Sequence, residues 1–281
     1  MKFKKMSYYS FGSENYPGVM KKINNTVKAA ECLGLNAEHK SYNASDKLRI
    51  LKDLTKDNSD LIFIRFSFFI STLLFPILIL KRFMGTKIVV DVPTPRSIVL
   101  NEMRGDDGKN VIMKILWSYF FCSWILFPAN LIIQYANESK YFSWGLRSKT
   151  IKMGNGILIE GSMKLVPQTK RSGKLNIIAV ASFAFWHGYD RLLKAIAEVK
   201  QTHPQIELHL TLVGSGNVLP DLKKMVDELN INSQVDFTGA LYGQELDYIY
   251  ENMDIGVSSL ALYRKGLSEA SDLKTREYMA K

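Results

Sequence analysis

Two glutamates near the end of the printed sequence flank a candidate helix start. Glu269 and Glu277 are separated by seven residues, and the intervening segment reads Ala-Ser-Asp-Leu-Lys-Thr-Arg. At about 100° per residue, a continuous helix would hold the two side chains about 80° apart, so they share a site best if Glu269 lies in a loop and Glu277 in the helix. Backbone N–H groups near Leu273, Lys274 and Thr275 would then form a helix N-terminus suited to a diphosphate, with Lys274 adding positive charge.

A glycine turn is the second feature with chemical potential. Gly214 and Gly216 follow an apolar run, where glycine permits a tight turn and close approach of the backbone to a ligand. The turn lacks the third glycine of a dinucleotide fingerprint, and Asp236 lies inside the next predicted strand instead of at its end. These departures disfavour NAD binding and leave an ordinary strand-to-helix turn as an open alternative.

The elements that must position these residues alternate as in α/β proteins. In the first half, apolar runs predict strands at 61–64, 87–92 and 131–134, with buried helices in the apolar stretches 61–80 and 115–133. In the second half the predicted strands are 175–181, 208–213, 234–237 and 254–258, and the predicted helices are 189–200, 219–229, 244–252 and 272–281. This order predicts parallel sheets covered on both faces.

A polar stretch rich in glycine separates the two halves. It runs from Lys149 to Lys174, so we expect two Rossmann-like domains, 1–152 and 153–281. The last predicted helix starts at an Asp or Ser cap and meets no Gly, Asn or Pro terminator before Lys281. We therefore expect the second domain to be cut short before it is complete.

Charge is distributed unevenly along the chain. The net charge is +10, and residues 1–165 hold 24 Lys and Arg against 13 Asp and Glu, whereas residues 166–281 hold 13 against 14. This asymmetry suits a first domain that faces anionic lipid or phosphate-bearing acceptors, and an apolar helix beside Lys81 and Arg82 suggests contact with an anionic membrane surface. No nucleic-acid motif accompanies the charge, and no metal-binding motif was found. Cys32 and Cys122 are too few for a disulfide framework, and their apolar helical contexts predict buried thiols.

Several motifs then occur in the order of one known family. The pair Glu269 and Glu277 resembles the E-x7-E signature of family-4 retaining glycosyltransferases, which have the GT-B fold. Supporting matches are Asn155-Gly156-Ile157, the run 181–191 (ASFAFWHGYDR), Leu212–Gly216 (LVGSG) and 235–239 (VDFTG). In the first half, Pro17-Gly18-Val19 and the segment 91–95 (DVPTP) are similar to bacterial polysaccharide glycosyltransferases.

The resemblance implies an α/β, GT-B architecture, with two Rossmann-like domains facing across a cleft. It implies that Glu277 binds the ribose of a nucleotide diphosphate-sugar, and that Glu269 contacts the transferred sugar near the reacting carbon. Retention in this family is thought to proceed with the departing phosphate assisting the attack, so the protein must chiefly stabilise the leaving diphosphate. No cofactor is implied, because the nucleotide-sugar is a substrate.

One departure from the family concerns the diphosphate contacts. The family commonly has an Arg and a Lys in the first loop of the donor domain, where a gapless match places Ser182 and His187. His187 would serve as a cation or as a neutral donor, with fixed charge from Arg191 or Lys274. Packing of His187 beside its aromatic neighbour remains the alternative.

Residues of the first half could complete the site. A loop with Gly18 and Val19 would approach the donor across the cleft, and Asp91, at a strand end, is a catalytic candidate. Glu102, Arg104 and Asp106 are candidates for an acceptor loop, and the choice of a catalytic base among these residues stays open.

The sequence thus predicts a cytoplasmic, hexosyltransferase-type enzyme of polysaccharide biosynthesis, at the inner face of the membrane. It would transfer sugar with retention from a nucleotide diphosphate-sugar to a glycan or lipid-linked acceptor. Two alternatives stay open. A non-catalytic or split-enzyme subunit would neither bind a nucleoside diphosphate nor release it from a nucleotide-sugar unless a partner supplies the remainder, and a nucleotide-sugar epimerase would isomerise sugar without an acceptor.

Overall fold

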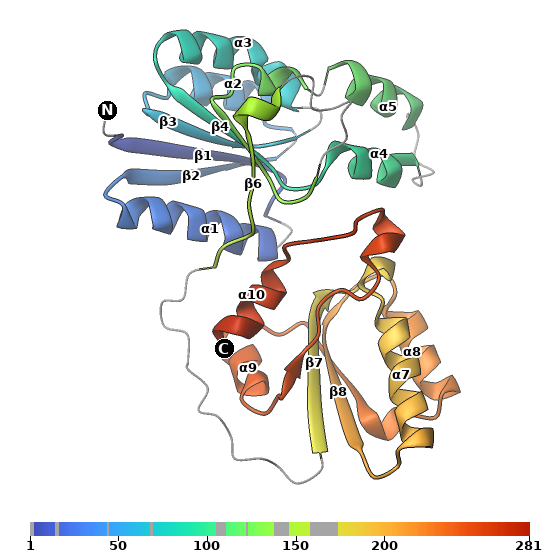
Figure 1. Cartoon of the computed structure of the whole chain (residues 1–281). Coiled ribbons are helices and arrows are strands. Elements are labelled where there is room, and N and C mark those ends of the chain that lie inside the picture. The colour runs from blue at the N-terminus through green and yellow to red at the C-terminus, as the bar shows by residue number, and fades with distance from the viewer. Residues whose placement is uncertain are drawn as a thin grey trace. The chain divides into compact units, whose positions relative to one another are not determined.

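The chain forms two compact α/β units. The structure, a computed structural model, describes residues 3–14, 17–43, 45–67, 70–104, 111–121, 123–137, 146–157 and 174–281. Unit 1 comprises residues 1–158 and unit 2 residues 159–281. Figure 1 shows unit 1 in blue to green and unit 2 in yellow to red.

Unit 1 is built on a six-stranded sheet in the order β2-β1-β3-β4-β5-β6, and all of its paired strands run parallel. Its central strands are buried on both faces, so they are almost continuously apolar, as in the Ile-Val-Val run of β4. The strands are β1 (Lys5–Phe11), β2 (Asn36–Tyr42), β3 (Leu61–Arg65), β4 (Lys87–Val92), β5 (Leu131–Gln134) and β6 (Thr150–Lys152).

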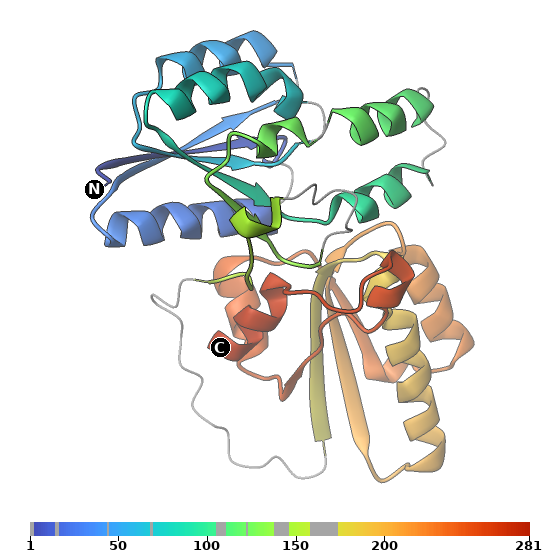
Figure 2. The same ribbon diagram turned by 45° about the horizontal axis from the view of Figure 1, so that its top comes forward.

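Helices cover both faces of this sheet. Helix α1 (Pro17–Cys32) lies on one face, and α2 (Lys47–Lys56) and α3 (Ile70–Phe83) lie together on the other (Figure 1). The larger core lies under α2 and α3, where Ile50, Leu54, Leu74 and Leu78 are fully buried. Helices α4 (Arg96–Arg104) and α5 (Val111–Phe120) pack on each other beside the sheet (Figure 2), and the short 3-10 helices η1 (Trp124–Leu126) and η2 (Leu146–Lys149) flank β5.

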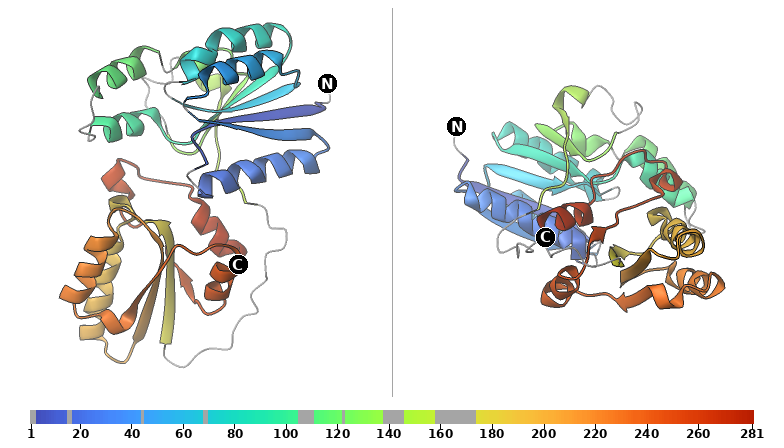
Figure 3. Two further views of the ribbon diagram at one scale, coloured as in Figure 1. Left: turned by 180° about the vertical axis from the view of Figure 1, so that it is seen from behind. Right: turned by 60° about the horizontal axis from the view of Figure 1, so that its bottom comes forward.

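Unit 2 has a four-stranded parallel sheet in the order β10-β7-β8-β9. One core lies between the sheet and helices α7 and α8, and a smaller one lies on the opposite face, toward α9 and α10 (Figure 3). The strands are β7 (Lys174–Ser182), β8 (Glu207–Ser215), β9 (Val235–Gly239) and β10 (Ile255–Gly256). The helices are α7 (Tyr189–Thr202), α8 (Leu219–Glu228), α9 (Gly243–Tyr250) and α10 (Leu273–Ala280), with short η3 (Phe185–His187), η4 (Asn232–Gln234) and η5 (Leu262–Lys265).

The structure confirms the predicted strands and the parallel sheets, but it corrects two predictions of burial. Cys32 is exposed because it lies at the solvent-facing end of α1, and Cys122 lies outside the described residues. Helix α3 buries Leu74 and Leu78 as predicted, whereas α5 leaves Leu116 and Phe120 exposed. Within the stretch 115–133 the α-helix is therefore only half-buried, with Ile115 and Tyr119 packed against the core, whereas Ile125 and Leu126 of a short 3-10 helix are fully buried.

Candidate functional site

Three loops of unit 2 meet at one edge of its sheet. They follow β7, β8 and β10, and because these strands are parallel, their carboxyl ends all lie at the same edge. The loop after β7 holds His187, the loop after β8 holds Gly216, and the loop after β10 holds Glu269 and leads into α10. The topology thus gathers the predicted donor-binding residues of unit 2 at the edge where α/β sheets bind ligands.

The two glycines of the β8 turn hold two of these loops together. Gly214 has φ +138°, and a side-chain carbon there would collide with the carbonyl oxygen of Ala181. A side-chain carbon at Gly216 would collide with the backbone of Phe183, whose N–H donates to the Ser215 carbonyl at 2.7 Å. Both glycines are therefore required by the contact between the β7 and β8 loops. Their contact with a donor stays a prediction.

His187 is held as a neutral imidazole. The Ala184 N–H donates to its Nδ1 at 3.1 Å, and its ring stacks on Tyr189 with centroids 5.6 Å apart. Burial and the positive charge of Lys274 lower the pKa of His187 to about 4. Because Nδ1 accepts a hydrogen bond, the neutral ring carries its hydrogen on Nε2, which makes Nε2–H the available donor.

Lys274 lies in the first turn of α10, close to the same aromatic ring. Its Nζ donates to the Tyr189 hydroxyl at 3.1 Å and lies 5.5 Å from the centre of that ring. Burial lowers the pKa of Lys274 to about 8, although the nearby Asp272 carboxylate raises it. Lys274 therefore loses its proton at a lower pH than an ordinary lysine, and it contacts the same tyrosine as His187.

The start of α10 leaves its backbone amides uncapped by a side chain. Asp272 is the N-cap residue, which confirms the predicted helix start. Its carboxylate accepts from Ser258 Oγ at 2.5 Å and from Thr275 Oγ1 at 2.8 Å, and it makes no cap hydrogen bond to the helix. The amides of the first turn, which opens at Leu273, therefore carry the positive end of the helix dipole without a side-chain acceptor from the cap.

The predicted glutamate pair is divided between loop and helix, as the angular argument requires. Glu269 is exposed in the loop before α10, and Glu277 is half-buried in the second turn. Burial raises the pKa of Tyr250 of α9, and the charge of Glu277 adds to this rise. The hydroxyl of Tyr278 accepts from the Val180 N–H at 2.9 Å and donates to the Val257 carbonyl at 3.3 Å, so α10 is fixed to the sheet next to Glu277.

Two arginines connect the loops by hydrogen bonds, and only one of them, Arg191, was among the predicted site residues. Arg191, predicted to supply charge for the diphosphate, donates to the Leu260 carbonyl at 2.7 Å, and its contact with a diphosphate stays a prediction. Arg264, which the sequence did not single out, makes two 2.8 Å hydrogen bonds to Asp190 and a third to the Phe185 carbonyl. No motif could have revealed this pair, because its two members are 74 residues apart.

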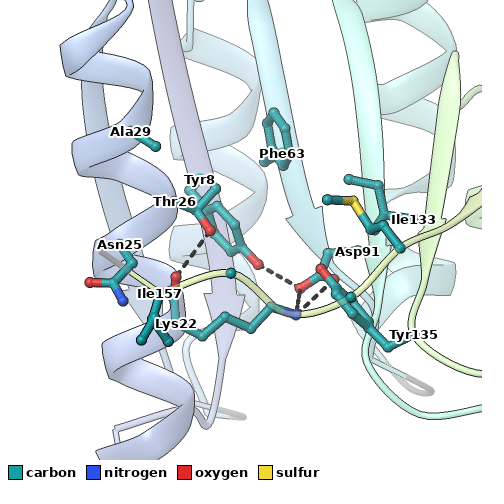
Figure 4. Close-up of a pocket in the computed structure, with 13 residues that line it drawn as sticks. Tyr8, Lys22, Asn25, Thr26, Ala29, Phe63, Asp91, Ile133, Tyr135 and Ile157 are labelled. Atoms are coloured by element: carbon teal, nitrogen blue, oxygen red, sulfur yellow. Dashed lines mark hydrogen bonds and ion pairs between the residues drawn. The ribbon is translucent and has the colours of Figure 1, made fainter. Parts of the chain in front are cut away.

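Unit 1 carries a separate pocket of about 300 Å³ on the α1 face of its sheet (Figure 4). Helix α1, strands β1, β3, β4 and β5, and the segment 153–157 form its walls. The lining is largely apolar, with polar groups gathered around Asp91. The lining residues are Tyr8, Lys22, Asn25, Thr26, Ala29, Phe63, Asp91, Ile133, Tyr135, Met153, Gly154, Gly156 and Ile157.

Asp91 is the centre of the polar end of this pocket, and only 3% of its side chain is exposed. Its carboxylate accepts from the Tyr8 hydroxyl at 2.7 Å, from Lys22 Nζ at 3.2 Å and from Arg65 at 3.2 Å (Figure 4 shows the first two). The strand register places Arg65 beside Asp91, and Lys22 reaches down from α1 over the ring of Tyr135. Burial lowers the pKa of Lys22 to about 8, against the opposing effect of Asp91.

Four of the remaining predicted residues of unit 1 lie in helices. Gly18 and Val19 belong to the first turn of α1, which Pro17 opens, so the prediction of a loop at these residues is wrong. Proline favours this position because its missing N–H needs no partner at a helix start. Glu102 and Arg104 fall in α4, and Asp106 lies outside the described residues.

Comparison with known proteins identifies the class of fold. Residues 164–268 match the family Glycosyl transferases group 1, and the match ends one residue before Glu269. A search of curated protein sequences found no significant match.

Solved structures match nearly the whole chain. Anabaena HepE, in complex with UDP, is 14% identical over 90% of this chain and 73% of its own, with a TM-score of 0.54. The lipopolysaccharide outer core galactosyltransferase WaaB is 12% identical over 91% and 74%, with a TM-score of 0.51. The trehalose-6-phosphate synthase OtsA is 13% identical over 99% and 82%, with a TM-score of 0.62.

These structural similarities establish the fold, and sequence identities of 12–14% establish no activity or ligand for this chain. The chain has the α/β GT-B fold with two Rossmann-like units, as predicted. The family match over residues 164–268, together with this fold, supports a GT-B glycosyltransferase.

Proposed function

We propose that the chain transfers a hexose from a nucleotide diphosphate-sugar to a glycan or lipid-linked acceptor, with retention of configuration. The observation that carries the proposal is the group of anion-binding elements at one edge of the unit 2 sheet. His187 and Lys274 both contact Tyr189, and Lys274 belongs to the first turn of α10. A neutral N–H donor, an ammonium group and a helix N-terminus together suit a diphosphate.

The donor would lie across the three loops, with its diphosphate at these groups. Glu277 would accept hydrogen bonds from the ribose hydroxyls and Glu269 from the hydroxyls of the sugar, because carboxylates accept paired hydroxyl protons well. UDP is the first nucleotide to test, since HepE was solved in complex with UDP.

The reaction exchanges one bond at the anomeric carbon for another. The bond between that carbon and the diphosphate oxygen breaks, and the acceptor hydroxyl forms the new bond on the same face. The hydroxyl proton passes to the departing phosphate. Negative charge that develops on the diphosphate would be stabilised by Lys274, by the His187 Nε2–H and by the first amides of α10, which are already in place before the reaction.

For the acceptor we propose the pocket around Asp91. The carboxylate is compensated by Lys22 and Arg65, so we assign Asp91 a positioning role, and not the catalytic role for which it was one of several candidates. It holds Lys22 at the wall of the pocket, where an acceptor with hydroxyl or phosphate groups would meet a cation.

Nucleotide binding by a Glu277 variant tests the proposal. Isothermal titration with UDP, ADP and GDP identifies the nucleotide, and Glu277→Ala should weaken its binding by about 1–3 kcal/mol, through lost charge-assisted hydrogen bonds. Glu228→Ala is the matched control, because Glu228 is exposed at the end of α8, which lies at the opposite edge of the sheet. Equal affinities for the Glu277 variant and the unaltered chain would remove Glu277 from the donor site.

Turnover then separates the enzyme from the two alternatives. With the matching nucleotide-sugar and an acceptor extract, the proposed enzyme releases nucleoside diphosphate and extends the acceptor. Neither binding nor release of nucleoside diphosphate by the chain alone would indicate a non-catalytic or split-enzyme subunit, and isomerised sugar without release would indicate an epimerase.

A further inference from the structure

Helix α5 of unit 1 exposes an apolar stripe. Ile112, Met113, Leu116 and Phe120 are 74%, 67%, 47% and 62% exposed. Three of them recur every four residues, so they share one side of the helix. Surface helices ordinarily present polar residues on that side, and clustered exposed apolar residues mark interaction sites. We call these four residues the α5 stripe.

Aromatic side chains connect α5 to the body of unit 1. Ring centroids of Trp117 and Phe121 lie 4.7 Å apart, those of Phe121 and Trp124 5.1 Å, and those of Trp124 and Phe75 of α3 5.5 Å. The chain of rings anchors α5 through η1 to α3. Trp124 is itself partly exposed, as is Phe127 just after η1, so the apolar surface continues beyond the stripe.

Exposed cations lie next to this surface. Residues 61–90 contain no Asp or Glu, and of their four Lys and Arg residues Arg82 is exposed, Arg65 pairs with Asp91 and Lys81 is buried. Lys149 donates to the Phe127 carbonyl at 2.9 Å, which places a cation beside the apolar surface. Arg82 is exposed next to Phe83 and Met84, themselves 85% and 77% exposed at the end of α3.

Helix α2 adds to this charge on the neighbouring surface, because α2 and α3 pack side by side (Figure 1). Four of its ten residues are exposed cations, and the only ion pair among them within the described residues is that of Arg49 with Asp53, at 3.7 Å. The sequence had pointed to Lys81 and Arg82 for lipid contact, but the Lys81 ammonium is buried and donates to the Thr55 and Asp57 carbonyls. Of the two, only Arg82 is exposed.

We propose that unit 1 docks on an anionic lipid bilayer through the α5 stripe, with the cations around α2, α3 and η1 facing the headgroups. Apolar side chains flanked by lysine and arginine suit the boundary between headgroups and acyl chains. A helix of ten residues is about 15 Å long, so α5 can lie in the interface but cannot cross the membrane. No described helix is both long and apolar enough to span one.

Charge also distinguishes this occupant from a second copy of the chain. A symmetric dimer through the α5 stripe would bring the same cationic elements of both copies together, and like charges across an interface oppose association. An anionic bilayer complements the apolar stripe and the cations at once. The inference goes beyond the proposed sugar transfer and does not depend on it.

Vesicle sedimentation with the whole chain tests the proposal. The chain should sediment with phosphatidylcholine vesicles that contain phosphatidylglycerol, and not with phosphatidylcholine alone, and added salt should release it. The double variant L116S/F120S should lower the partition coefficient at least about tenfold, because two apolar side chains no longer enter the interface. Leu33→Ser is the control, since Leu33 is 76% exposed at the end of α1 and should bind as the unaltered chain does.

Three results would overturn the proposal. They are equal sedimentation with both vesicle types, unchanged binding of L116S/F120S while its circular dichroism shows a folded chain, and an equal loss in the Leu33 control. Sedimentation velocity without lipid provides the remaining check. Dimers that L116S/F120S abolishes, without vesicle binding by the unaltered chain, would assign the α5 stripe to self-association instead.

Discussion

Lys274 provides a prediction in which the pH dependence of nucleotide binding follows from one contact. Its pKa is lowered to about 8 by burial, so its ammonium titrates close to physiological pH. A bound diphosphate favours the charged form and raises this pKa, so binding is strongest below pH 8 and weakens as pH rises through it. His187, with a pKa of about 4, stays neutral over this range, so it does not change the affinity between pH 7 and 9.

The size of the effect follows from the same value. With a pKa of about 8, the protonated fraction is about 0.9 at pH 7 and about 0.1 at pH 9, so the dissociation constant rises about tenfold if only the ammonium form binds. That factor corresponds to about 1.4 kcal/mol. Phosphate groups titrate near pH 6, so a diphosphate keeps its charge over the interval.

Isothermal titration between pH 7 and 9 measures this change in the dissociation constant. Lys274→Arg should keep its charge and give a flat profile, since arginine does not lose its proton here. Lys274→Met should also be flat, but about tenfold or more weaker at pH 7, through loss of a charge-assisted hydrogen bond. The placement of the diphosphate beside Lys274 would be refuted if the dissociation constant of Lys274→Met rose with pH as that of the unaltered chain does. It would also be refuted if the dissociation constant of the unaltered chain did not change between pH 7 and 9.

Two further predictions concern stability. Asp91→Ala should lower the free energy of unfolding by about 3 kcal/mol in urea denaturation, because it removes the carboxylate partner of buried Lys22, and an unchanged midpoint would contradict the compensated cluster. Gly216→Ala should cost about 1–3 kcal/mol, since its Cβ collides with the Phe183 backbone, whereas Gly18→Ala meets nothing within 4 Å and should cost nothing. Equal thermal midpoints for the two glycine variants would mean that the β7 and β8 loops are not in tight contact.

Apolar strands could be predicted from the sequence, and polar strands could not. Strands β4 and β8 are apolar runs ended by turn residues, and such runs predict buried parallel strands. No strand was predicted in the first 60 residues, because β1 and β2 are rich in serine, lysine and other polar residues. Their polar groups are satisfied by distant partners, for example Ser7 by Ser59 at 2.9 Å, and no local pattern reveals such pairs.

The candidate site also contains residues that a local sequence pattern marks and residues that only the fold brings together. Glu269 and Lys274 could be predicted because they surround a helix start that the sequence marks locally, and the structure has that helix start. Tyr189, which both His187 and Lys274 contact, was missed because an aromatic residue opening a helix resembles ordinary core. The compensation of Asp91 was also hidden, since Lys22 and Arg65 are brought to it only by the sheet.

Hydrogen–deuterium exchange with a saturating nucleotide tests the central claim most directly. Unit 2 should bind the nucleoside diphosphate with the three loops at one edge of its sheet. We therefore expect slower exchange at amides 183–188, 214–218 and 269–278, with little change at the opposite ends of α7 and α8. Protection confined to unit 1, or a saturated nucleotide that protects none of these three segments, would contradict the account.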